Sequence, residues 1–133
     1  MADARIAVVD LGSNSFRMVV FASGDGWWKR TDEIHEAVRI GEGADQTGEL
    51  GAEPMARALT TIELFAHFVR ATGLDETHAV ATSAIRAASN REAFLARARE
   101  HLDVRVLSEE EEARYGYLAA FNSTSLADGT VLD

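Results

Sequence analysis

The chain has 133 residues, of which 47% are hydrophobic and 26% charged, the proportions of a single soluble globular domain. It contains no cysteine, which excludes thiol catalysis, iron–sulfur clusters, thiolate zinc sites and disulfides. Thirteen Lys+Arg against 22 Asp+Glu give a formal net charge of −9, which argues against nucleic acid or a membrane surface as a partner. Local groups must therefore hold any anionic ligand.

We expect neither a membrane-spanning segment nor a secretory leader in this sequence. No apolar run approaches the roughly 18 residues of a transmembrane span, and the first short run, at residues 6–9, ends at Asp10. The expected location is the cytoplasm. Because Lys29 is the only lysine, a lysine-containing P-loop is excluded as well.

The first forty residues predict a β-meander. Apolar segments at 5–10 and 16–22, separated by polar residues, predict two strands. After a turn at 23–26, residues 27–40 mix aromatic, β-branched and charged side chains, which predicts a third strand and part of a fourth. Residues 41–51 contain four glycines and no periodicity, and we expect a loop there.

Helices predominate in the second half of the chain. Residues 54–73 carry apolar side chains at three- and four-residue steps between a proline and a glycine, which predicts a helix. A short apolar segment at 77–82 predicts a central strand. Ser89 followed by Glu92 is a capping-box pattern, which predicts a helix to about His101.

The last elements complete an α/β pattern. Residues 104–107 predict a short strand, and Ser108 with Glu111 forms a second capping-box pattern that opens a helix to about Phe121. The whole order is a three-stranded meander followed by α–β–α–β–α. It predicts an α/β fold with a mixed five-stranded sheet, and the ribonuclease-H-like arrangement fits it.

A first candidate site follows the first strand. Asp10 ends that strand, and Gly12, Ser13, Asn14 and Ser15 form the turn after it. Glycine lets a ligand approach the backbone, and successive N–H groups with hydroxyl and amide side chains can form a phosphate-binding concavity without net positive charge. An ordinary hairpin turn, capped by the Asp10 carboxylate, explains the same residues.

Two further candidates are Arg86 and Glu112. Arg86 follows the predicted central strand, at the end where open α/β sheets bind ligands, and it pairs there either with a phosphate or with a nearby acid. Glu112 is the last of four glutamates that open a helix, where carboxylates interact favourably with the helix dipole. Gly116 and Ala119 share its helix face, so this smooth face fits either a ligand beside a general base or close helix packing.

The chain resembles the exopolyphosphatase and guanosine pentaphosphate phosphohydrolase family (Ppx/GppA) in three motifs that keep the family's order and spacing. They are residues 9–17 (VDLGSNSFR), 81–90 (ATSAIRAASN) and 107–114 (LSEEEEAR). Residues 39–43 (RIGEG) fit the same pattern. The resemblance implies the superfamily of actin, sugar kinases and heat-shock chaperones, in which two ribonuclease-H-like domains hold a phosphorylated ligand between them.

The resemblance also implies a role for each motif. Residues 12–15 correspond to the first phosphate-binding loop, and Arg17 is expected to bind phosphate with them. Glu112 matches the catalytic glutamate, and Arg86 matches the active-site arginine. The implied reaction is hydrolysis of a terminal phosphoanhydride. Glu112 would orient or deprotonate water, and Arg86 and the loop N–H groups would stabilise the transferred phosphoryl group.

The implied cofactor is Mg²⁺, with Asp10 and Asp133 as carboxylates near it. We expect residues 1–124 to form the N-terminal phosphatase domain and residues 125–133 to be a linker and the first strand of a second domain. The expected partners are that second domain, polyphosphate or guanosine penta- or tetraphosphate, and a second copy in a homodimer of the full-length protein. Without the second domain, the chain is expected to fold but to release no phosphate.

Two other functions are compatible with these motifs. An ATP-dependent phosphotransferase of the same superfamily would share the first phosphate loop, but it has no need for a water-activating Glu112. A non-catalytic module that senses an alarmone or polyphosphate would bind the ligand without turnover. The motifs leave open whether the substrate is polyphosphate or guanosine pentaphosphate.

Overall fold

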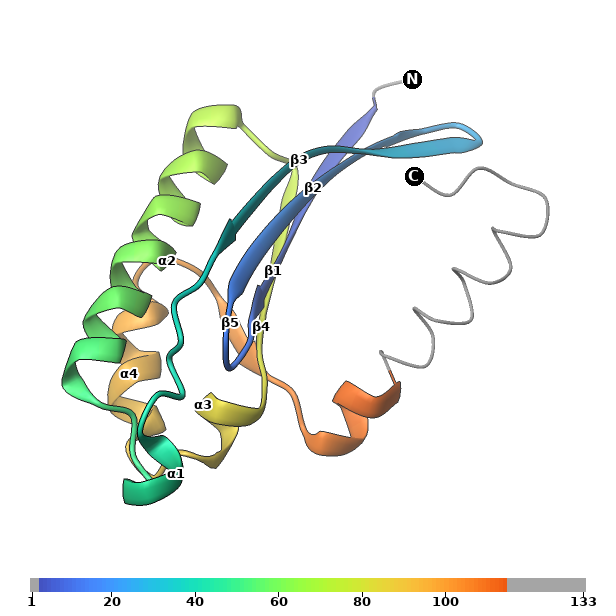
Figure 1. Cartoon of the computed structure of the whole chain (residues 1–133). Coiled ribbons are helices and arrows are strands. Elements are labelled where there is room, and N and C mark those ends of the chain that lie inside the picture. The colour runs from blue at the N-terminus through green and yellow to red at the C-terminus, as the bar shows by residue number, and fades with distance from the viewer. Residues whose placement is uncertain (1–2, 115–133) are drawn as a thin grey trace.

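The computed structural model describes residues 3–114 and begins with the predicted meander (Figure 1). β1 (Ala4–Leu11), β2 (Phe16–Gly24) and β3 (Trp27–Glu36) pair antiparallel in succession. The alternate residues Ala7, Val9 and Leu11 of β1 are buried, as expected for a strand with one face on the core.

Two later strands extend the sheet in parallel. β4 (Glu76–Ala81) pairs parallel with β1, and β5 (Val104–Val106) pairs parallel with β4. The sheet order is β3-β2-β1-β4-β5. The mixed five-stranded sheet and the ribonuclease-H-like order of elements are therefore confirmed.

Helices α2 (Ala52–Thr72) and α4 (Arg91–Ala98) cover one face of the sheet (Figure 1). The buried residues of α2 recur at three- and four-residue steps and are Pro54, Ala58, Leu59, Ile62, Phe65 and Ala66. This stripe packs on the core side of the sheet and confirms the helix that the sequence predicts. Truncating the fully buried Phe65 to alanine would cost about 3–5 kcal/mol of folding free energy.

The segment between β3 and α2 differs from the prediction. β3 ends at Glu36, so the expected continuation of strand structure to residue 40 is wrong. Arg39 has a φ of 52°, a left-handed conformation that interrupts a strand. The expected loop at 41–51 contains a single helical turn, α1 (Ala44–Thr47), between two glycines that both adopt positive φ.

The two predicted capping boxes have opposite outcomes. At residue 108 the box forms, because the Ser108 N–H donates to Glu111 Oε1 and the Glu111 N–H donates to Ser108 Oγ, both at 3.0 Å. The box at Ser89 is wrong. Asn90 precedes α4 instead, and its side chain forms no capping hydrogen bond with the helix. The Leu50 N–H donates to Asn90 Oδ1 at 2.9 Å, and Asn90 Nδ2 donates to the Leu50 carbonyl at 3.0 Å.

The remaining boundaries are close to those predicted. α4 ends at Ala98, earlier than the expected His101. A short helix, α3 (Ser83–Ala87), directly follows β4, and residues 109–114 are helical. The continuation of that helix to Phe121 and the domain boundary after residue 124 lie outside the described residues. Among residues 3–114, no helix is both long and apolar enough to cross a membrane.

Candidate functional site

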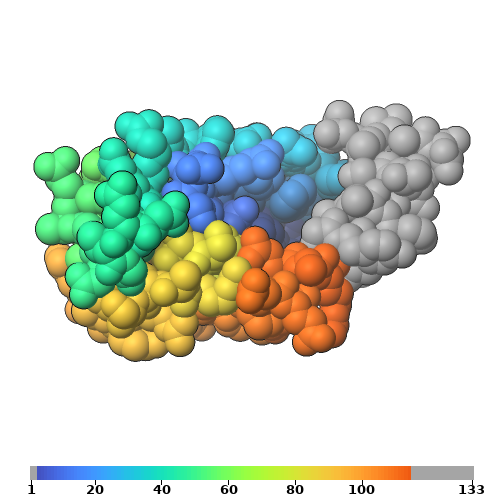
Figure 2. Space-filling view, turned by 60° about the horizontal axis from the view of Figure 1, so that its bottom comes forward, coloured from blue at the N-terminus to red at the C-terminus, as the bar shows by residue number. Residues whose placement is uncertain are grey.

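The three motifs meet at one edge of the sheet. β1, β4 and β5 run parallel, so the segments that follow them emerge at the same side. These segments are the turn at 12–15, α3, and the chain from Leu107 onward. Figure 2 brings this end of the molecule forward and shows the blue, yellow and orange segments side by side.

The turn at 12–15 is fixed by hydrogen bonds to the segment after β4. The Gly12 N–H donates to the Ser15 carbonyl at 3.1 Å. The Ser13 and Ser83 hydroxyls share a hydrogen bond of 2.7 Å, and Ser13 Oγ accepts from the Ala84 N–H at 3.1 Å. Ser13 therefore ties the first motif to the second, although they are seventy positions apart in the chain.

A second segment fixes the turn from its other side. The Arg39 N–H donates to the Asn14 carbonyl at 2.9 Å, and the Gly41 N–H donates to the Ser13 carbonyl at 3.3 Å. A Cβ atom on Gly41 would lie 3.2 Å from the Ala84 Cβ, a tight contact, so the close approach of the two segments favours glycine here. The left-handed backbone of Arg39 costs about 1–3 kcal/mol, which these contacts must offset.

The amide groups of this turn are left available for a ligand. The Ser13 and Asn14 carbonyls accept from the 39–41 segment, whereas the N–H groups of the same two residues donate to no acceptor within residues 3–114. Successive free N–H groups are the feature of an anion-binding concavity. This geometry favours the phosphate-binding interpretation over an ordinary hairpin turn.

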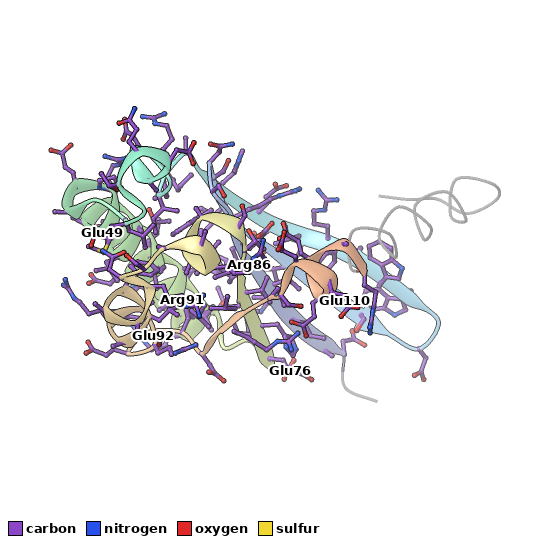
Figure 3. All side chains as sticks on the ribbon, turned by 90° about the horizontal axis from the view of Figure 1, so that it is seen from below. Glu49, Glu76, Arg86, Arg91, Glu92 and Glu110 are labelled. Carbon is purple, nitrogen blue, oxygen red and sulfur yellow. The ribbon has the colours of Figure 1, made fainter. Side chains whose placement is uncertain are left out.

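Arg86 and Glu112 form an ion pair at the same edge. Arg86 Nη1 donates to Glu112 Oε1 at 3.0 Å and to the Leu107 carbonyl at 2.8 Å. In Figure 3, Arg86 on α3 lies next to the helical turn at 109–114. Nε and Nη2 of Arg86 have no partner among the described residues, so this edge of the guanidinium can bind a phosphate while Nη1 stays paired.

Asp10 lies near this pair, on the face of the sheet that α2 and α4 leave open. Loss of hydration from neighbouring protein atoms raises the pKa of the Asp10 carboxyl, the negative charge of Glu112 raises it further, and Arg17 opposes both effects. Arg17 is the cross-strand neighbour of Asp10 and forms an ion pair with Glu33 on β3. A phosphate at Arg17 would have to compete with Glu33.

The donor set at Asp10 fits a magnesium ion. No group of three or more metal-binding side chains occurs within residues 3–114, but Mg²⁺ is usually held by one or two carboxylates together with substrate phosphates and water. Burial is the main cause of the raised pKa of Asp10, and the charge of Glu112 is the second. A cation beside the two carboxylates would favour the charged form of Asp10 against both effects. Asp133, the other predicted carboxylate, lies outside the described residues.

Two residues of this edge have no role in the sequence prediction. Ser83 follows the predicted central strand, and its hydroxyl in a polar segment is the only local signal for its bond to Ser13. Arg39 lies in the segment 39–43 that fits the family pattern, but its contact with Asn14 depends on tertiary packing and has no local signal.

The sheet order and the helices that cover it define an α/β domain of the actin-like ATPase type. The sequence model that describes the Ppx/GppA phosphatase family matches residues 19–133 of this chain. The chain therefore belongs to the Ppx/GppA phosphatase family.

Solved structures agree with this assignment. The chain is 32% identical to a Ppx/GppA family member from Aquifex aeolicus, with a TM-score of 0.85, covering 92% of this chain and 40% of that one. The type II variant of the Aquifex aeolicus phosphatase gives 31% identity and a TM-score of 0.82, covering 93% of this chain and 41% of that one. An exopolyphosphatase from Cytophaga hutchinsonii gives 27% and 0.71, with 77% and 33% covered. The chain thus spans about two-fifths or less of these structures.

Proposed function

We propose that this chain forms the phosphate-binding half of an enzyme that hydrolyses the terminal phosphoanhydride bond of polyphosphate or guanosine pentaphosphate. The observation that carries the proposal is the Arg86–Glu112 ion pair beside the free N–H groups of the turn at 12–15. A cation, a carboxylate and an anion-binding turn are the groups that phosphoryl transfer to water requires.

The proposed roles follow from the free atoms of each group. Glu112 Oε1 is held by Arg86, so Oε2 accepts the proton of the water that attacks the terminal phosphorus. The bond from that phosphorus to the bridging oxygen breaks, releasing phosphate and a substrate shortened by one phosphoryl group. Arg86 and the turn N–H groups bind the non-bridging oxygens, whose charge Mg²⁺ near Asp10 would help to neutralise.

Two alternatives predict different products. An ATP-dependent phosphotransferase would move the phosphoryl group to an acceptor such as a sugar, and a sensing module would bind the ligand without turnover. The match to a phosphatase family favours hydrolysis over phosphotransfer.

A substrate panel on the full-length protein tests the proposal. The protein is incubated with Mg²⁺ and polyphosphate, guanosine pentaphosphate, or ATP plus sugars, and phosphate release and phosphorylated products are measured. We expect release of inorganic phosphate from at least one of the first two substrates. Sugar phosphorylation, or binding without turnover on every substrate, would contradict the proposal.

A further inference from the structure

The sheet face that α2 and α4 leave open carries an apolar patch. Val8 of β1 alternates with buried residues and therefore points to this face, where it lies opposite Val19 of β2. Trp28 of β3 extends the patch, because its ring meets that of Phe21 edge-on with the ring centroids 5.8 Å apart. The residues of this open-face patch are Ile6, Val8, Val19, Phe21, Trp28 and Val80.

The described part of the chain leaves the open-face patch exposed. Val8 is 39% exposed and Trp28 47%. The exposure of Val8 is not an edge effect, because β1 is the middle strand of the sheet. Strands that pair in parallel, as β1 does with β4, are normally covered on both faces. An apolar surface of this kind therefore indicates that another segment or molecule packs on it.

The helical turn at 109–114 begins on the same side of the sheet. Figure 1 shows this orange turn on the side opposite α2 and α4. Glu111 pairs with Arg105 at 3.2 Å, and Glu112 pairs with Arg86 at 3.0 Å. Glu112 is also close enough to Asp10, on the open face, for its charge to contribute to the raised pKa of Asp10. The helix thus starts where the open face meets the carboxyl edge of the sheet.

The two ion pairs show which face of this helix meets the domain. Glu111 and Glu112 are half-buried, whereas residues 109–110 and 113–114 are exposed. Residues four or seven positions further along an α-helix lie on the same face. Counted from Glu111 and Glu112, the apolar residues on this face are Tyr115, Leu118 and Ala119.

The length of the predicted helix fits the open-face patch. Leu118 is about 9 Å beyond Glu112 along a helix, and Val8 is about 7 Å from Asp10 along β1. A helix that starts beside Asp10 and runs back along β1 therefore reaches Val8 within two turns. A helix of about a dozen residues with Gly116 inside it is not stable alone in water, so it requires an apolar surface to pack on.

We propose that residues 115–121 continue the helix that Ser108 caps and pack on the open-face patch, with Tyr115 and Leu118 against Val8 and its neighbours. The occupant of the patch is thus a segment of the same chain. A second domain or a second copy of the chain would cover the same face in a different way, and the experiments below distinguish them.

The packing has a consequence for the site. It holds the first turn of the helix against the sheet, and with it the Glu112 carboxylate beside Arg86. Leu118 is then a positioning residue that acts through Glu112 and does not touch the substrate. This consequence rests on the proposed function of Glu112, whereas the packing itself does not.

Cysteine labelling of the full-length protein tests the packing. Residues 1–133 contain no cysteine, so Val8→Cys introduces a single thiol there, and mass spectrometry assigns the label to position 8. We expect a thiol reagent to modify Val8→Cys at least about tenfold more slowly than Asp25→Cys on the exposed β2–β3 turn. Equally fast labelling at the two positions would overturn the proposal, because the face would then be open.

Two further substitutions identify the segment that protects position 8. Leu118→Asp, combined with Val8→Cys, places a charge in the contact and should raise the labelling rate about tenfold. Tyr117→Asp is the matched control on the opposite helix face and should leave the rate unchanged. Leu118→Ala, which preserves helix propensity, should raise the rate less and replaces Leu118→Asp if that variant does not fold.

Two results with these variants would also overturn the proposal. If labelling is slow and no substitution at Leu118 changes it, another domain or a second copy covers the face. If Tyr117→Asp raises the rate as much as Leu118→Asp does, the helix face is wrongly assigned.

Steady-state kinetics test the effect on Glu112. Leu118→Ala should lower kcat about tenfold with KM nearly unchanged, because a displaced Glu112 impairs the chemical step and not phosphate binding. Tyr117→Ala should change neither constant. An unchanged kcat in a Leu118→Ala protein whose position 8 has become accessible would overturn the positioning role.

Labelling and turnover separate this inference from the proposed function. If the wild-type protein releases no phosphate from any substrate, the hydrolase proposal fails, and the labelling rates still decide the packing. If it releases phosphate and position 8 is labelled as fast as position 25, the packing proposal fails and the hydrolase proposal stands.

Discussion

Arg86 and Glu112 lie 26 residues apart in the chain, yet one guanidinium nitrogen bonds the carboxylate at 3.0 Å. Their side chains are 21% and 42% exposed, respectively, so the arginine is mostly enclosed while the glutamate remains accessible to water. The Arg86 nitrogen also bonds the Leu107 carbonyl, directly after β5. This pair therefore fixes the helical turn at 109–114 against the end of the sheet.

The two bonds from Nη1 lead to a prediction for Arg86. Lysine can pair with Glu112, but a single ammonium group cannot also present a planar edge to a phosphate. We predict that Arg86→Lys and Arg86→Ala lower kcat/KM of the full-length enzyme to values within about tenfold of each other. A fully active Arg86→Lys enzyme would contradict direct contact with the phosphoryl group.

The Ser13–Ser83 hydrogen bond leads to a prediction about positioning. Ser13→Ala and Ser83→Ala each remove the same bond of 2.7 Å, so their effects should not add. We predict a coupling free energy of about 0.5–1.5 kcal/mol in a double-mutant thermal-unfolding cycle.

Substitutions in the turn at 12–15 should also affect catalysis. Because the proposed role of the turn is to bind phosphate and not the rest of the substrate, Ser13→Ala combined with Asn14→Ala should raise KM for every phosphorylated substrate. An effect on KM for one substrate alone would exclude the phosphate role. In the double-mutant cycle, additive effects on stability would show that Ser13 and Ser83 act independently.

Asp10 gives a prediction for the pH dependence of stability. Its pKa is raised in the folded protein, so the folded state binds the proton more tightly than the unfolded chain does. The free energy of unfolding therefore falls as the pH rises through the raised pKa. We predict that Asp10→Asn is more stable than the wild type above this range and that the difference disappears in more acidic solution.

Glu111 supplies a control of opposite sign. The Ser108 backbone N–H, as the main cause, lowers the pKa of Glu111, so its stabilising effect is present at neutral pH and is lost as the pH falls through the lowered pKa. Urea unfolding of Asp10→Asn and of Glu111→Gln between pH 3 and 8 (roughly the range over which carboxyl groups titrate) measures both effects. Equal pH profiles for Asp10→Asn and the wild type would contradict the raised pKa.

Magnesium should act on the same residue. If Asp10 contributes to a cation site, Mg²⁺ should raise the melting temperature of the wild type more than that of Asp10→Asn. An identical shift in both proteins would exclude Asp10 as a ligand.

The local features of this fold were predictable, and the tertiary contacts of the site were not. The spacing of apolar residues and a following glycine gave α2 nearly its observed bounds, and Ser108 with Glu111 correctly marked a helix start. The same capping-box pattern failed at Ser89. There Asn90 precedes the helix, and its side-chain amide is hydrogen-bonded to the backbone of Leu50, forty residues away. Sequence periodicity carries no information about such a contact.

The candidate site divides in the same way. Arg86 and Glu112 could be chosen as candidates because Arg86 lies shortly after a predicted strand and Glu112 lies in the first turn of a predicted helix. The roles of Arg39 and Ser83 depend on bonds to Asn14 and Ser13 from distant segments. Only the folded sheet brings these segments together.

The central claim is that Glu112 activates water for attack on a phosphoanhydride, and steady-state phosphate release by Glu112→Gln in the full-length protein tests it most directly. Glu110→Gln is the matched control, since two residues along a helix place Glu110 on another face. We predict that Glu112→Gln lowers kcat by about 10²–10⁴ with KM nearly unchanged, and that Glu110→Gln has little effect. Equal losses of kcat in the two variants would contradict the claim, because the whole acidic turn would then act as a helix cap.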